Sequence, residues 1–222
     1  MKIEFLGHSS FAITGTQAKM VTDPFDPAMM GIAYPKVTAD IVTVSHEHSD
    51  HNNAKAVGGE PASQRGEPVI FRLPGEYERK GARVYGSMTY HDDAKGSERG
   101  KNTMFKFILD GMVLLHCGDL GHIPSDALLE RIKDTDILMI PVGGTFTIDA
   151  KQAKELVTKI APSIVLPMHY GDSALKPEFS VLTPVDEFLK LNASTTTHQK
   201  DSLTVTEETL PEEREIVVLK RL

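Results

Sequence analysis

The 222-residue chain contains no tryptophan and a single cysteine, Cys117. One cysteine excludes an intrachain disulfide, which fits a reducing compartment such as the cytoplasm. The chain also lacks any apolar run approaching the ~18 residues of a membrane-spanning helix. Residues 1–8 lack the apolar stretch of a signal peptide. We therefore expect a cytoplasmic protein without a membrane span.

An excess of positive charge is also missing. The chain has 24 Lys and Arg against 31 Asp and Glu, so its formal net charge is −7. An acidic protein is a poor partner for nucleic acid, so we expect a small-molecule substrate instead. Hydrophobic residues at 40% and charged residues at 25% exclude a disordered chain. The length fits one domain over residues 1–222 and leaves the oligomeric state open.

The apolar pattern changes character along the chain. Short β-rich runs predict strands at 2–6, 10–14, 18–22, 41–45, 69–73 and 82–90, followed by a hairpin of 103–109 and 112–117 around Asp110-Gly111. Helices are then expected at 125–133, 150–160 and 184–191, alternating with strands at 136–141 and 163–167; strands at 203–206 and 216–220 end the chain. Ser125 and Asp149 are expected as caps, and Pro184 as a first helical residue. The alternation predicts a layered α/β fold, with two sheets inside and helices outside.

The nine histidines are the unusual feature, and three of them fall in His46-Glu-His-Ser-Asp-His51. This segment follows a run predicted to be a buried strand, and a helix is expected after it at 52–57. Side chains alternate in an extended turn, so His46 and His48 point one way, while Asp50 and His51 reach a neighbouring position. The geometry suits two adjacent cations. A zincin helix is excluded because Asp50 stands where its second histidine is needed.

This segment resembles the His-x-His-x-Asp-His motif of the metallo-β-lactamase superfamily. Asp23 in Thr-Asp-Pro, Gly118-Asp119 after the hairpin and His169 after a strand agree with it. Gly7-His8-Ser9-Ser10 and Pro74-Gly75-Glu76-Tyr77 resemble its small single-domain branch of zinc-dependent hydrolases, near the ascorbate-phosphate lactonases. The resemblance implies a four-layer αβ/βα sandwich with a metal site at one edge of the two sheets.

The resemblance also implies metal ligands. His46 and His48 would bind a first metal, Asp50, His51 and His169 a second, and Asp119 would bridge them, with Asp50 and His169 as the catalytic candidates. The first metal needs a third histidine, either His91 or His116. Strand alternation places His116 opposite Asp119 if the strand stays regular, whereas His91 ends its own strand, so His91 is preferred.

Other residues are weaker candidates. Asp23 is expected to accept a hydrogen bond from a ligand imidazole. His8 either approaches the cleft or caps a turn, and His122 either lines the cleft or lies at the surface. Glu76 either faces substrate or supports the Pro-Gly turn. A polar loop over 92–102, with three basic residues, is either solvated or a lid over the cleft.

The expected function is hydrolysis by a hydroxide held between two divalent ions, zinc being preferred and manganese or iron also acceptable. Two such ions with two carboxylates leave the centre positively charged, which favours a small anionic substrate such as a phosphodiester, a lactone or a related ester. The alternatives are a nuclease or phosphodiesterase that acts on nucleic acid, and a non-hydrolytic metal-binding sensing module.

Overall fold

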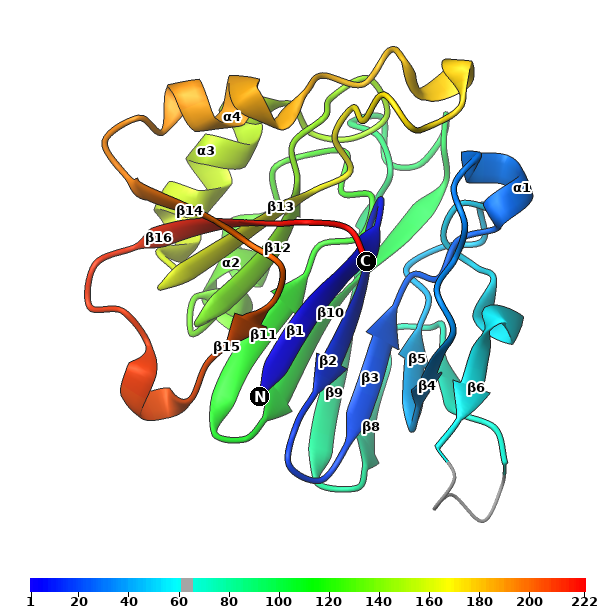
Figure 1. Cartoon of the computed structure of the whole chain (residues 1–222). Coiled ribbons are helices and arrows are strands. Elements are labelled where there is room, and N and C mark those ends of the chain that lie inside the picture. The colour runs from blue at the N-terminus through cyan, green and yellow to red at the C-terminus, as the bar shows by residue number, and fades with distance from the viewer. Residues whose placement is uncertain (61–65) are drawn as a thin grey trace.

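A computed structural model describes residues 1–60 and 66–222. Two mixed sheets form its centre (Figure 1). The smaller has the order β15-β1-β2-β3-β5-β7, with bounds β1 (Lys2–Gly7), β2 (Ser10–Thr14), β3 (Lys19–Thr22), β5 (Ile41–Thr43), β7 (Val69–Phe71) and β15 (Leu203–Thr204). The larger has the order β14-β16-β13-β12-β11-β10-β9-β8, with bounds β8 (Gly75–Arg79), β9 (Ala82–Tyr90), β10 (Lys101–Leu109), β11 (Met112–His116), β12 (Ile137–Pro141), β13 (Ile164–Met168), β14 (Thr196–Lys200) and β16 (Glu215–Leu219).

Helices and a small ribbon cover the outer faces, as the predicted αβ/βα sandwich requires. The helices are α1 (Pro27–Met30), α2 (Asp126–Ile132), α3 (Ala150–Ile160) and α4 (Val185–Leu191). Figure 1 shows α3 and α4 on one side of the molecule and α1 on the other, with the parallel pair β4 (Val37–Ala39) and β6 (Val57–Gly59). Within the described ranges, three short 3-10 segments complete the elements, at Ala54–Ala56, Pro177–Phe179 and Glu207–Thr209.

The principal core lies between the two sheets and beneath α3. It includes Phe11 of the smaller sheet and Phe105 and Phe107 of the larger. Helix α3 has the expected bounds because Asp149 forms a capping box with Gln152, while its apolar face is buried. None of the helices in the described ranges is long and apolar enough to cross a membrane.

The predicted hairpin is confirmed: β10 and β11 pair antiparallel from Leu109–Met112 to Phe105–His116, and both turn residues, Asp110 and Gly111, have positive φ. Four strands, β4, β6, β8 and β14, were not predicted. Two of these, β8 and β14, are the edges of the larger sheet, so they are largely exposed and lack the apolar pattern of a central strand.

Several local expectations were wrong. Residues 52–57 form one 3-10 turn and the start of β6 instead of a helix. Pro184 is the N-cap of α4 and not its first helical residue, whereas Ser125 occupies the N-cap of α2 as expected, although without a side-chain hydrogen bond. Helix ends fray and shift by one or two residues, so local composition does not fix the exact terminal residue.

Candidate metal centre

Polar side chains from six segments meet at one edge of the two sheets. Strands β3 and β5 are parallel, as are β11, β12 and β13, so within each sheet their carboxyl ends lie together. Each segment follows a strand end: His8 follows β1, Asp23 follows β3, 46–51 follow β5, His91 follows β9, Asp119 follows β11 and His169 follows β13. Elements distant in sequence thereby build one site.

Asp119 lies at the centre of this site. Its Oδ2 is 3.1 Å from Nε2 of His169, 3.2 Å from Nε2 of both His51 and His91, and 3.9 Å from Nε2 of His46. Four imidazole nitrogens around one carboxylate oxygen exceed what hydrogen bonding to that oxygen needs. The arrangement is typical of a carboxylate that shares cations with several histidines.

Apart from a set formed by Asp23, His46 and His51, the donor atoms fall into two compact groups. One consists of His46, His48 and His91, and the other of His8, Asp50, His51 and His169; within each group the donor atoms lie within 4.8 Å of one another. Asp119 lies between the groups, because its Oδ2 contacts histidines of both. The structure thus brings together all seven residues named as ligands from the sequence, and it adds His8 to the second group.

The residues present fit metal ions. His46 Nε2, His51 Nε2 and Asp119 Oδ1 are buried and have no hydrogen-bond partner in the described part of the chain. Leaving such atoms unpaired costs free energy, which a cation among them would recover. Two imidazoles beside a carboxylate are donors that zinc, manganese and iron all accept.

The pKa shifts of His46, His8 and Asp119 match those of ligands, whereas His51 differs: burial lowers its pKa, but the Asp119 and Asp50 carboxylates outweigh burial and raise it well above the usual value. Burial, followed by the neighbouring His51, lowers the pKa of His46 to about 3, and burial followed by His169 lowers the pKa of His8 to about 4. Burial alone would raise the pKa of Asp119, but the adjacent His169 and His51 outweigh it and hold that pKa well below its usual range. Neutral imidazoles and an ionised carboxylate are the forms that bind metals.

Asp23 supports two of the histidines at once. Its Oδ2 accepts hydrogen bonds from His51 Nδ1 at 2.9 Å and from Ser45 Oγ at 2.5 Å, while its Oδ1 accepts from Ser45 N at 2.8 Å. Because the single hydroxyl proton of Ser45 goes to Asp23, Ser45 Oγ accepts from His46 Nδ1 at 2.9 Å. Both imidazoles are therefore held with Nε2 free to bind a cation.

Backbone strain gathers at the same place. His8, Asp23 and His169 have φ values of 56°, 37° and 51°, a region that residues other than glycine rarely adopt. The strained turns are tied together, since His169 N donates to His8 O at 2.8 Å. Such strain is retained where the fold gains a precisely placed side chain.

His91 lies in the first group and His116 in neither, but the alternation argument used for this assignment does not apply here. The condition that the strand stays regular fails, since β11 ends at His116 and Gly118 turns the chain with φ 55°. His116 lies between the sheets beneath the site, where its Nε2 donates to Ser9 O at 2.7 Å and its ring contacts Phe11.

Two sequence candidates lie away from the donor groups. His122 donates from Nδ1 to Ile123 O and accepts from Tyr90 N, so both of its ring nitrogens form hydrogen bonds with the backbone. Glu76 is exposed on β8, where alternation turns Tyr77 and not Glu76 toward the site.

Two supporting residues were missed by the sequence reasoning, Ser45 and Asn102. The buried Asn102 accepts from Asp119 N at 3.0 Å and donates to Cys117 O, which fixes the turn before Asp119. Neither residue belongs to a motif. The only available signal was the position of Ser45 directly before His46.

Comparison with known proteins agrees with this geometry. The profile of the Beta-lactamase superfamily domain matches residues 2–169, which is most of the chain. The chain belongs to the beta-lactamase superfamily. Among curated proteins, a UPF0173 metal-dependent hydrolase of Pelotomaculum thermopropionicum is 31% identical over 197 residues, covering 77% of this chain and 85% of that protein. One from Carboxydothermus hydrogenoformans is 31% identical over 196 residues, with the same shares covered.

A solved structure extends the similarity over the whole chain. The crystal structure of a proposed Zn-dependent hydrolase of the metallo-beta-lactamase superfamily, from Thermotoga maritima, is 37% identical, with a TM-score of 0.80. It covers 100% of this chain and 99% of that one. This member of the beta-lactamase superfamily is accordingly a metal-dependent hydrolase, as the sequence predicted.

Proposed function

We propose that this hydrolase works with two divalent cations, zinc being preferred. His46, His48 and His91 would hold the first, Asp50, His51 and His169 the second, and Asp119 would bridge them. The observation that carries the proposal is the placement of Asp119 Oδ2 within 3.1–3.9 Å of four histidine nitrogens drawn from both groups.

Bound cations of this kind would supply hydroxide near neutral pH and neutralise charge that develops on a carbonyl or phosphoryl oxygen. The chain's own contribution is positioning. Asp23 and Ser45 fix the tautomers of His51 and His46. Asp50 lies at the mouth of the site with its side chain 15% exposed, where it can orient the attacking water while it serves the second cation.

Water is the proposed nucleophile because Ser9 is fully buried, the Ser10 hydroxyl is engaged and the Cys117 thiol is inert. Ser10 Oγ donates to Thr22 O at 2.7 Å. Cys117 is fully buried, and burial raises the pKa of its thiol far above the usual range. None of these three groups is available for covalent catalysis.

The proposed substrate is a small anionic ester, lactone or phosphodiester, because a positively charged cation pair attracts an anion to the reacting bond. The acidic chain disfavours nucleic acid. We further propose a single cytoplasmic domain over residues 1–222, since one principal core includes residues from Ile3 to Leu219 and the single cysteine suits a reducing compartment.

The test is metal analysis of protein purified without added metal, followed by hydrolysis assays on phosphodiesters, lactones and thioesters. We expect two equivalents of metal per chain and turnover of at least one substrate that a chelator abolishes and added zinc restores. Protein that holds metal tightly at one equivalent, or hydrolysis that survives complete metal removal, would contradict the proposal.

A further inference from the structure

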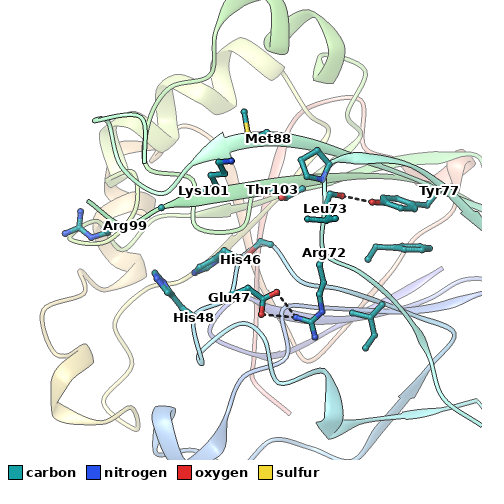
Figure 2. A pocket seen from close by; sticks show the side chains of 15 residues that line it. His46, Glu47, His48, Arg72, Leu73, Tyr77, Met88, Arg99, Lys101 and Thr103 are labelled. Carbon is teal, nitrogen blue, oxygen red and sulfur yellow. Dashed lines mark hydrogen bonds and ion pairs between the residues drawn. The ribbon is translucent and has the colours of Figure 1, made fainter. Parts of the chain in front are cut away.

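A cavity of about 810 Å³ opens beside the first histidine group, with His46 and His48 in its wall. Figure 2 shows Arg99 and His48 toward one end of it and Leu73 and Tyr77 toward the other, with His46 and Lys101 between them. The volume lies in the range typical of small-molecule sites, ~300–1,000 Å³. Its lining therefore describes what a substrate of the metal centre meets beyond the reacting bond.

Part of the wall of this cavity is apolar. Ile70, Leu73 and Met88 are 42%, 69% and 48% exposed, and they are half of the six exposed large hydrophobic side chains in the described ranges. The surface beneath them is firmly built, because Tyr77 stacks on Phe71 at 4.2 Å and donates to Leu73 O at 2.8 Å. A fixed apolar wall within a ligand-sized cavity favours an apolar ligand group.

The end nearer the histidines is cationic, although the whole chain is acidic. Arg72 is neutralised by Glu47, at 2.8 Å between Nη1 and Oε1. Lys101 has no ion-pair partner in the described part of the chain, and Arg99 has only the exposed Glu98 at 3.6 Å. The cavity therefore presents two cations that are available to an anionic group.

The loop that carries Arg99 is ordered from within. The Asp92 carboxylate accepts backbone N–H bonds from Ala94, Gly96, Glu98 and Arg99 at 2.7–3.1 Å. The Arg99 guanidinium lies 5.9 Å from the centre of the Phe146 ring. This loop, expected to be a solvated stretch or a lid, is a structured support that holds a cation at the cavity.

We infer that the cavity binds an amphipathic anionic ester, with its apolar acyl group against Ile70, Leu73 and Met88 and its anionic group near Arg99 and Lys101. The ester bond would then lie beside His46 and His48. The inference rests on the proposed hydrolase function and narrows its substrate class. In the reaction, water adds to the carbonyl carbon, the ester C–O bond breaks, and an apolar carboxylic acid and an anionic alcohol leave.

The first experiment measures binding without turnover. Calorimetry on the purified full chain compares octanoate, butyrate and octyltrimethylammonium. Each fully buried methylene favours binding about fourfold, so with partial burial of four more methylenes we expect octanoate to bind at least about tenfold more tightly than butyrate. The cationic amphiphile should bind at least about tenfold more weakly than octanoate.

Variants then separate the two halves of the cavity. Leu73→Ser together with Met88→Ser should reduce the preference for octanoate over butyrate below about threefold. Lys101→Gln should weaken the binding of octanoate and of butyrate by a similar factor. Val181→Ser, at another exposed apolar residue, and Lys151→Gln, at an exposed lysine on α3, are the matched controls and should change neither.

The second experiment measures hydrolysis of acetylsalicylate and octanoylsalicylate, for which we expect a lower KM with the longer acyl chain. Equal binding of octanoate and butyrate, with both esters hydrolysed alike, would overturn the substrate class and leave the hydrolase function standing. Retained octanoate preference without hydrolysis of either ester would instead count against the hydrolase function. If the Leu73 and Met88 changes alter only the oligomeric state by light scattering, the apolar wall is an interface between copies and the inference is wrong.

Discussion

Replacing Asp23 by Asn should disable both cation positions with a single atom change. Asp23 Oδ1 accepts from a backbone N–H, that of Ser45, so the amide oxygen must stay on that side. The new NH₂ group then faces Ser45 Oγ and His51 Nδ1, which both become acceptors. His51 must move its proton to Nε2. Ser45 turns its hydroxyl proton toward His46 Nδ1, so the proton of His46 must also move to Nε2.

The expected size follows from the role of such supporting contacts. Loss of a partner that orients a metal-binding histidine costs about 10–100-fold in metal affinity, or about 1.4–2.7 kcal/mol. Asp23→Asn should impose this cost at both positions, since one histidine belongs to each group. Ser45→Ala removes the hydroxyl that links Asp23 to His46 but leaves the hydrogen bond between Asp23 and His51, so it should weaken the first position alone.

The assay is a competition titration of zinc against a chromophoric chelator, with folding checked by circular dichroism. Asp40→Asn is the matched control, because Asp40 is also buried and bonds Lys19 N and Lys80 away from the histidines. It should lower stability and leave zinc affinity unchanged. Wild-type zinc affinity in folded Asp23→Asn would refute the tautomer argument. If Asp23→Asn does not fold, an unchanged first position in Ser45→Ala would refute it.

Four further outcomes are expected. Asp50→Ala should abolish hydrolysis with little change in melting temperature, because Asp50 lies at the mouth of the site and outside the core. His116→Ala should cost about 2–3 kcal/mol in denaturant unfolding, through a cavity and an unpaired Ser9 carbonyl, with two metals still bound. Cys117 should resist thiol reagents until the protein unfolds, because burial raises the pKa of its thiol. Burial tends to raise the pKa of Asp92, but its four backbone N–H donors outweigh burial and lower that pKa below the ordinary value. The stability that Asp92 contributes is therefore complete above the ordinary pKa of an aspartate and is lost only as the pH falls through the lowered pKa. Amide exchange in the loop should accordingly stay slow at pH 5 and accelerate in Asp92→Asn.

Much of the fold was predictable where local and global preferences agree. The hairpin at Asp110-Gly111 and helix α3 behind Asp149 have both a local turn or cap signal and a matching apolar pattern. Strands β8 and β14 have neither, because their stability comes from pairing with one neighbour at a sheet edge. Their sequences, rich in charged and polar residues, resemble loops when read alone.

The features of the site also divide into those that local sequence identified and those that it did not. The ligands within 46–51 are close in sequence, so spacing alone grouped them. The relay through Asp23 and Ser45 joins residues 22 positions apart, and the approach of His8 to Asp50 joins residues even more distant. The direction of Asp119 depends on Gly118, whose positive φ breaks the alternation on which the argument against His116 relied. These features arise from tertiary contacts that no local pattern specifies.

The central claim is that seven side chains hold two cations around Asp119. The most direct measurement is a crystal structure of the zinc-loaded protein with anomalous data at the zinc absorption edge. The account predicts two peaks about 3.5–4 Å apart, one among His46, His48 and His91 and one among Asp50, His51 and His169, with Asp119 reaching both. A single peak in fully loaded protein, or a zinc ion bound by His116 in place of His91, would contradict it.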